Sequence, residues 1–119
     1  MERAIVDTSS GQIIIRKDVI AEYAGHVAIS TTGIVGMAMI SMKDGVYKLL
    51  KKESLRKGIN VNIENNKVSI DFHVIVAYGV NIQSIAQNVV NTVTYEVEAF
   101  TGIKVKNVNI YVEGIKIID

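Results

Sequence analysis

The chain has 119 residues, of which 49% are hydrophobic and 21% are charged, as in an ordinary globular domain. It contains no cysteine, which excludes disulfides, thiolate metal sites and a cysteine nucleophile. The formal net charge of +1 gives no overall attraction to nucleic acid. We therefore expect residues 1–119 to form a single soluble, cytoplasmic domain.

The N-terminal half is predicted to contain one strand and two helices. Apolar residues alternate over Gly11–Asp18 and recur at helical spacing over Asp18–Ser30, and a shorter helix is predicted over Lys43–Gly58. The uncharged stretch Val27–Met42 falls short of the roughly 18–20 apolar residues of a spanning helix, so we expect no direct membrane insertion. Within it, the G-I-V-G unit Gly33–Gly36 is expected to form a tight turn packed into the core.

The C-terminal half carries the clearest pattern. Apolar and polar residues alternate over residues 58–79 on both sides of "ENNK", which predicts an antiparallel hairpin with Asn65 and Asn66 in its turn. An amphipathic helix follows over Asn81–Gly102, with an apolar stripe that includes Ile82 and Phe100. Residues 104–117 are predicted to form the last strand.

The expected order of elements is β-α-α-β-β-α-β. This order predicts an α+β fold, in which a small, mostly antiparallel sheet has helices packed on one face. The end of the hairpin, Val74–Tyr78, is apolar on both faces. We expect that segment to be covered on both sides or to lie at an interface.

Several blocks of the sequence, taken in order, resemble a known family. They are "GQIIIRKDVIAEYAGHVA", "TGIVGM", "KGINVNI", "VSIDFHVIVAYGVNI" and "TGIKVKNVNIYVEGI", and together they run from Gly11 to about Gly114. In this order and spacing they resemble the alkaline shock protein family of Gram-positive bacteria, also called envelope stress response proteins. The family usually has Ser or Thr where Arg16 stands and often Pro where Thr32 stands, which affects the expected start of the first helix and the turn at Gly33.

The resemblance carries functional expectations that the residues alone do not give. It implies no catalytic activity and no cofactor. It also implies a cytosolic protein that partner proteins hold near the membrane, with a role in cell-envelope homeostasis and stress. Some short members without terminal extensions, which this chain resembles, are associated with lipid metabolism instead.

Two features of the N-terminal half offer an RNA-binding alternative. A G-x-x-G loop between two helices clamps nucleic-acid backbone in KH domains, but the middle pair here is the apolar Ile34-Val35. The segment Lys43–Lys57 contains six basic and two acidic residues, a net charge of +4. Such a face can dock an acidic partner, lipid head groups or nucleic acid, although it is more often simply solvated.

Asp71 and His73 are the residues that could belong to a metal or catalytic site. They lie two residues apart on the outward face of one predicted strand, and the alternative is that both are ordinary surface residues. Two ligands are too few even for a catalytic zinc site, and no nucleophile motif accompanies them. His26, four residues after Glu22, has the spacing of a surface pair on a helix. We therefore predict no catalytic and no metal-binding residues.

The outward rows of the sheet provide a candidate surface for a protein partner. Asn60, Asn62, Ser69, Asp71 and His73 are predicted to coat one face, with Asn107, Asn109 and Tyr111 beside them. Tyr111 and Tyr78 are suited to anchor a contact. The full candidate partner surface comprises Lys48, Lys51, Lys52, Arg56, Asp71, His73, Tyr78, Asn109 and Tyr111.

The favoured hypothesis is a non-enzymatic interaction protein. It would form homo-oligomers or dock on a protein partner, which would be membrane-anchored. The alternative is a KH-like RNA-binding module that uses Gly33–Gly36 and the basic segment 43–57. A third class, an enzyme that uses Asp71 and His73, would require a shaped pocket around them.

Overall fold

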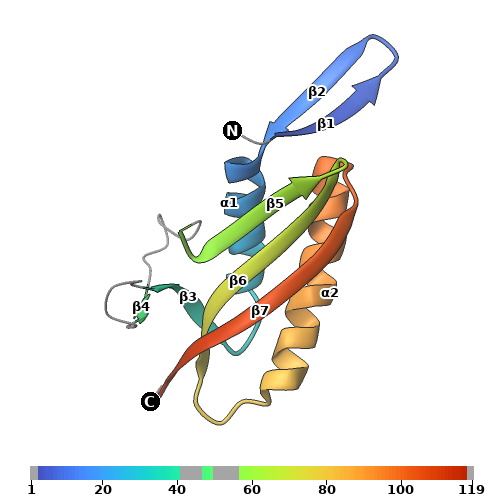
Figure 1. Ribbon diagram of the computed structural model, residues 1–119. Coiled ribbons are helices and arrows are strands. Elements are labelled where there is room, and N and C mark those ends of the chain that lie inside the picture. The colour runs from blue at the N-terminus through green and yellow to red at the C-terminus, as the bar shows by residue number, and fades with distance from the viewer. Residues whose placement is uncertain (1–2, 41–46, 50–56, 118–119) are drawn as a thin grey trace.

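The structure is a computed structural model that describes residues 3–40, 47–49 and 57–117. Within these ranges the chain forms two helices and seven strands (Figure 1). Their bounds are β1 Arg3–Thr8, β2 Gly11–Arg16, α1 Lys17–Ile29, β3 Ile34–Ile40, β4 Tyr47–Leu49, β5 Ile59–Glu64, β6 Lys67–Ala77, α2 Ile82–Thr101 and β7 Val105–Lys116. The predicted α+β class is confirmed.

The main sheet is built around β6. This strand pairs antiparallel with β5 along its first part and with β3 near its end, while β7 pairs parallel along its other side. β4 pairs antiparallel with β3. The sheet is thus mostly antiparallel, as predicted. The β6–β7 pair is parallel because α2 crosses over between the two strands.

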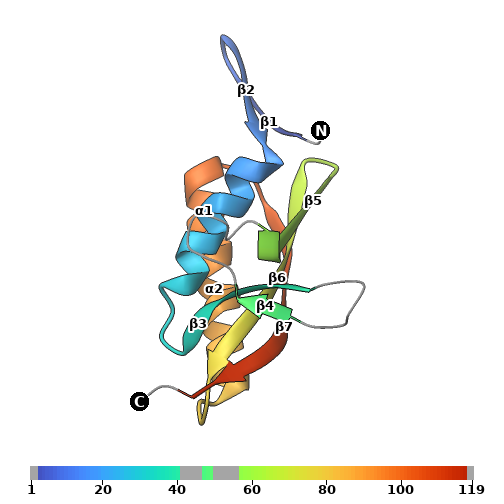
Figure 2. The ribbon, with the colours of Figure 1, turned by 90° about the vertical axis from the view of Figure 1, so that its left-hand side faces the viewer.

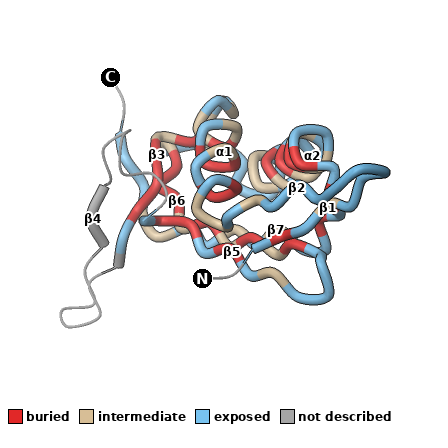
Figure 3. Tube along the Cα trace, turned by 90° about the horizontal axis from the view of Figure 1, so that it is seen from above, coloured by how far each residue is buried: buried red, intermediate tan, exposed pale blue. Residues whose placement is uncertain are grey.

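Both helices cover the same face of this sheet, as predicted (Figure 2). α1 packs against β3 and β5, and α2 packs against β7. The buried residues lie between the helical layer and the sheet (Figure 3). Phe72 on β6 and Ile20 on α1 are fully buried there, together with Val89, Val93 and Val97 on α2.

Local signals at the hairpin and at α2 explain why those predictions hold. Asn65 and Asn66 adopt φ values of 52° and 58°, the left-handed conformation that a tight hairpin turn needs. Asn81 caps α2, because its side-chain oxygen accepts a hydrogen bond from the Ser84 N–H at 2.9 Å. Gly102 ends α2 with a φ of 72°.

The two helices meet at an aromatic pair. Tyr23 of α1 stacks on Phe100 of α2 with ring centroids 4.0 Å apart, and its hydroxyl donates to Glu96 at 3.3 Å. Desolvation, followed by the hydrogen bond and the charge of Glu96, raises the pKa of the Tyr23 phenol. Phe100 nevertheless stays 54% exposed and Ile82 stays 42% exposed, so the predicted apolar stripe of α2 is not buried at its two ends.

The prediction for the segment between α1 and β5 is wrong in two places. Residues after Gly33 form the strand β3 rather than only a packed turn, and Tyr47–Leu49 form the strand β4 rather than part of a helix. Most of the predicted helix Lys43–Gly58 lies outside the described residues. The glycines and the helical spacing of apolar residues were misleading, because the conformation of these segments is determined by strand pairing. β3 pairs with β6, which is distant in sequence, and β4 pairs with β3.

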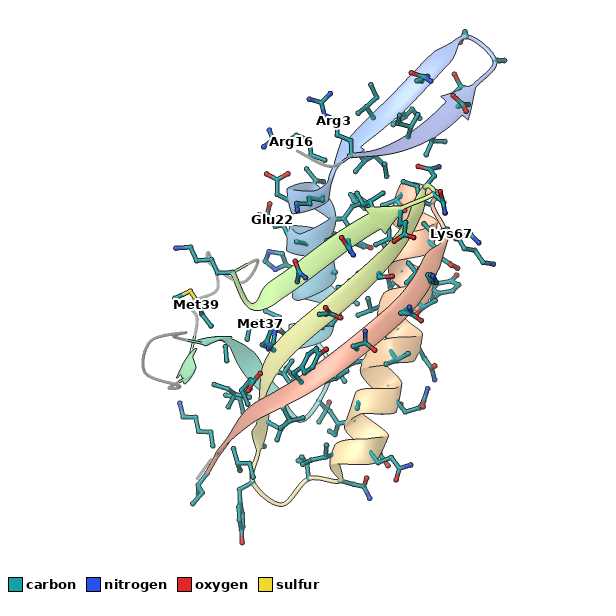
Figure 4. The ribbon with its side chains drawn as sticks, in the orientation of Figure 1. Arg3, Arg16, Glu22, Met37, Met39 and Lys67 are labelled. Carbon is teal, nitrogen blue, oxygen red and sulfur yellow. The ribbon has the colours of Figure 1, made fainter. Side chains whose placement is uncertain are left out.

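A strand that the sequence did not indicate, β1, pairs with β2 to form a two-stranded hairpin that projects from the body (Figure 1). We call Arg3–Arg16 the arm. Figure 4 shows Arg3 and Arg16 together at the base of the arm, as their cross-strand pairing requires. Ala4 is fully buried against the core, whereas Ile13 and Ile14 are each 51% exposed.

The hairpin turn of the main sheet holds the arm in place. The Asn66 side chain accepts from the Ile5 N–H at 2.8 Å and donates to the Ile5 carbonyl oxygen at 2.6 Å. One amide side chain thus bonds both backbone groups of Ile5, as a neighbouring strand would.

The arm should loosen when Asn66 is replaced by glycine. Asn66→Gly keeps the positive φ accessible but removes both hydrogen bonds, so we expect a loss of about 1–2 kcal/mol of stability. The Ile5 amide should exchange its hydrogen faster in native-state exchange measured by NMR. Asn65→Gly is the matched control, because Asn65 has a similar φ, and it should leave exchange at Ile5 unchanged. Equal exchange at Ile5 in both variants would contradict this role for Asn66.

Candidate functional site

The sheet face opposite the helices carries the polar rows that the sequence predicted. We call it the outer sheet face. It comprises Asn60, Asn62, Ser69, Asp71, His73, Asn107, Asn109, Tyr111 and Glu113. The alternation of β6 explains its central row, since buried Ile70 and Phe72 alternate with partly exposed Ser69, Asp71 and His73.

The strand register brings the predicted residues together across three strands. Asp71 lies opposite Asn60 of β5 and Asn109 of β7, and His73 lies opposite Tyr111 of β7. The Asn109 amide donates to the Asp71 carboxylate at 2.9 Å. The structure therefore places Asp71, His73, Asn109 and Tyr111 side by side on the outer sheet face.

His73 is held by a residue that the sequence analysis missed. Its Nδ1 lies 2.7 Å from a carboxylate oxygen of Glu113, and its ring stacks on Tyr111 with centroids 4.9 Å apart. The His73 and Glu113 side chains are 29% and 22% exposed. The position of Glu113, two residues after Tyr111, was a signal for the same face, but the β6–β7 pairing was needed to recognise it.

Asp71 and His73 thus have different partners and do not converge on a shared ligand position. Among the described residues, no group of three or more His, Cys, Asp or Glu side chains could hold a metal ion. A pocket of about 170 Å³ lies between α1 and β5, where it is lined by Lys17, Asp18, Ala21, Ile59, Asn60 and Val61. Neither Asp71 nor His73 lines it.

The other candidate residues are not part of this cluster. Tyr78 lies just past the end of β6 and is 71% exposed, and its N–H donates to the Lys116 carbonyl oxygen at 2.9 Å. Lys48 lies on β4, and its side chain is not described. Lys51, Lys52 and Arg56 lie outside the described residues.

The Gly33–Gly36 unit does not have the form of an exposed loop between two helices. Gly33 has a φ of 99° in the turn after α1, while Gly36 is buried within β3. A Cβ on Gly33 would meet Ile85 of α2. Ile34 is buried as predicted and Met37 is buried as well, and Figure 4 shows Met37 and Met39 on β3. The described residues therefore give the KH-like alternative no support.

Comparison with known proteins agrees with the resemblance read from the sequence. Residues 6–117 match the model of the alkaline shock protein 23 family, which is described as having a cell envelope-related function. The chain belongs to the alkaline shock protein family. Family membership also accounts for the order of the sequence blocks, because the match covers β2 through β7 and the second half of β1.

Similar relatives come from Gram-positive bacteria. The uncharacterized protein YloU of Bacillus subtilis is 42% identical over 111 residues, which are 92% of each chain. The uncharacterized protein Spy1614 of Streptococcus pyogenes is 35% identical over 114 residues, 95% of this chain and 94% of the relative. A stress response regulator gls24 homolog of S. pyogenes is 28% identical over 109 residues, 89% of this chain and 59% of the relative.

No solved structure matches the chain. In the described part of the chain, neither helix has the length and apolar character needed to cross a membrane.

Proposed function

We propose that this protein is a non-enzymatic interaction protein of cell-envelope homeostasis, which docks on a membrane-anchored partner protein through the outer sheet face. The family model supports an envelope-related role, and the gls24 relatives are named as stress response regulators. The observation that carries the proposal is the ordered cluster of Asp71, Asn109, His73, Tyr111 and Glu113 on an uncovered sheet face.

The chemistry of this face favours a protein partner. It offers amide donors and acceptors and an aromatic ring, the groups that protein interfaces use at their centres and rims. His73 and Tyr111 are already ordered by stacking and by Glu113, so binding loses less side-chain entropy than it would at a mobile surface. These side chains would act as a pre-formed docking platform.

The charges of this face support association with the membrane through a protein rather than through lipid. In the middle of this face the charged side chains are the carboxylates of Asp71 and Glu113. The lysine in the same row of β6, Lys67, lies at the hairpin end, opposite Glu64 of β5, and forms no basic cluster there. Anionic head groups attract basic clusters and would repel these carboxylates. A cytoplasmic protein with this surface would therefore reach the membrane through an anchored partner.

Photo-crosslinking in cells tests the proposal. We would place p-benzoylphenylalanine at Asn62, which is exposed on the outer sheet face, and separately at Glu22, which is exposed on α1 in the helical layer (Figure 4). We expect an adduct with an integral membrane protein from position 62 and none from position 22. The same adduct from both positions, adducts with RNA, or no membrane-protein adduct from position 62 would overturn the proposal.

A further inference from the structure

The outer edge of β7 is open. β7 pairs with β6 on one side, and no strand in the described part of the chain pairs with its other side (Figure 1). β7 has twelve residues, and every second one therefore directs its backbone N–H and C=O groups away from the sheet. An edge of this length can accept another strand.

The middle of this edge lacks the charged residues that commonly protect edge strands. Asn107–Val112 contains no charge and is rich in β-branched residues. The nearest charged residues are Lys106 at one end and Glu113 at the other, where the register with β6 shifts. The open edge is thus uncharged in its middle and carries opposite charges at its two ends.

The exposed residues of the helix beside this edge are uncharged as well, and its two carboxylates, Glu96 and Glu98, are only partly exposed. The Glu98 carboxylate accepts from the Val105 N–H at 2.9 Å, which shows which side of α2 lies next to β7. Asn91 and Gln87 precede Glu98 by about two and about three helical turns, so they lie on that same side. The exposed residues of α2 are Ile82, Gln83, Ser84, Gln87, Asn88, Asn91, Thr92, Tyr95, Ala99 and Phe100.

We propose that a second copy of this chain binds here, with the two β7 strands paired antiparallel and the two α2 helices side by side. A two-fold axis normal to the sheet relates the copies, so each uncharged surface meets its own counterpart without opposing like charges. Antiparallel pairing also brings Lys106 of one copy toward Glu113 of the other copy. This charge complementarity favours a second copy as the occupant.

The proposed dimer would bury a helix face as well as a strand edge. Strand pairing alone would bury little side-chain area, but α2 adds a helix about 30 Å long beside the edge. Tyr95, which is 70% exposed on α2, adds aromatic surface. Together these elements can approach the roughly 1,200 Å² of total buried area at which specific interfaces begin.

The dimer would also change how the proposed docking works. The two-fold axis places both outer sheet faces on the same side of one continuous sheet, so an oligomeric partner could be bound at two points at once. Such bivalent attachment strengthens binding without any new contact. This consequence rests on the proposed function, whereas the dimer itself does not.

Charge reversal at Asn91 tests the dimer with purified full-length protein. Asn91 lies near the middle of α2, close to the proposed axis, and its exposed position tolerates Lys or Glu. Sedimentation equilibrium should show a wild-type dimer that is weakened at least about tenfold by either Asn91→Lys or Asn91→Glu. An equimolar mixture of the two variants should recover dimer. Asn62→Lys and Asn62→Glu, on β5 at the other side of β6, are the matched controls and should leave the dimer unchanged.

A second measurement addresses the strand edge. In the wild type, backbone amides of residues 107–112 should exchange more slowly at high than at low protein concentration, because pairing protects them. The proposal would be overturned if the wild type were a monomer at all concentrations, or if neither Asn91 substitution weakened the dimer. It would also be overturned if the mixture of the two variants formed no dimer. The crosslinking experiment at position 62 tests docking on a membrane protein separately. The docking proposal and the dimer proposal can therefore fail independently.

Discussion

Replacing Phe72 with alanine is expected to lower the free energy of unfolding by about 3–5 kcal/mol, since it removes a fully buried aromatic ring from the core. Phe72 lies on the central strand β6, with Ile59 of β5 and Ile110 of β7 as its register partners. Its side chain faces the layer formed by α1 and α2. The neighbouring elements are joined to β6 by strand pairing, so the cavity should close only in part.

Equilibrium urea unfolding, followed by circular dichroism, measures this loss. Asn62→Ala is the control, because Asn62 is exposed on the adjacent strand β5 and its truncation should stay within about 0.5 kcal/mol. A loss below about 1 kcal/mol for Phe72→Ala would mean that the helices do not pack on this side chain.

The sequence was sufficient to predict the C-terminal half of the fold. In this half, local chemistry and tertiary structure favour the same elements: the alternation of β5 and β6, the Asn65-Asn66 turn and the Asn81 cap all agree with the observed packing. Val74–Val76 is apolar on both faces of the strand, and all three residues are buried within one chain.

The N-terminal half depends on pairings that no local pattern reveals. β1 carries a single fully buried residue, Ala4, so it has little apolar signal of its own. β3 is apolar on both faces and contains Gly36, which is more typical of a turn than of a strand. What makes these segments strands is contact with β2 and β6, from elsewhere in the chain.

The same distinction applies to the outer sheet face. Alternation placed Asp71, His73, Asn109 and Tyr111 on one face correctly, since the direction of a side chain from a strand is a local property. The contact of His73 with Glu113 depends on β7 lying parallel to β6 with a register shift, which is a property of the whole fold. The sequence therefore predicted the face but not the partner of each side chain.

Gly33→Ala is the second change with a large expected effect, a loss of about 2–4 kcal/mol. Gly33 has a φ of 99°, which costs a residue with a Cβ about 1–2 kcal/mol. An added Cβ would also overlap Cδ1 of Ile85, and relieving that overlap costs about 1–2 kcal/mol more. The Gly33 carbonyl oxygen accepts from the Ala77 N–H at 3.0 Å, so the turn cannot move without disturbing β6.

Gly79→Ala separates the two contributions, because Gly79 has a similar φ of 87° but open space around its Cα. It should lose only the cost of the backbone conformation. In a double-mutant cycle, Ile85→Ala should recover part of the loss in Gly33→Ala and none of the loss in Gly79→Ala. If the two glycine variants unfold at the same urea concentration, Gly33 is required only for the backbone conformation of the turn. If Gly33→Ala is the less stable by more than about 1 kcal/mol, Gly33 is also required for α2 to pack against the turn that follows α1.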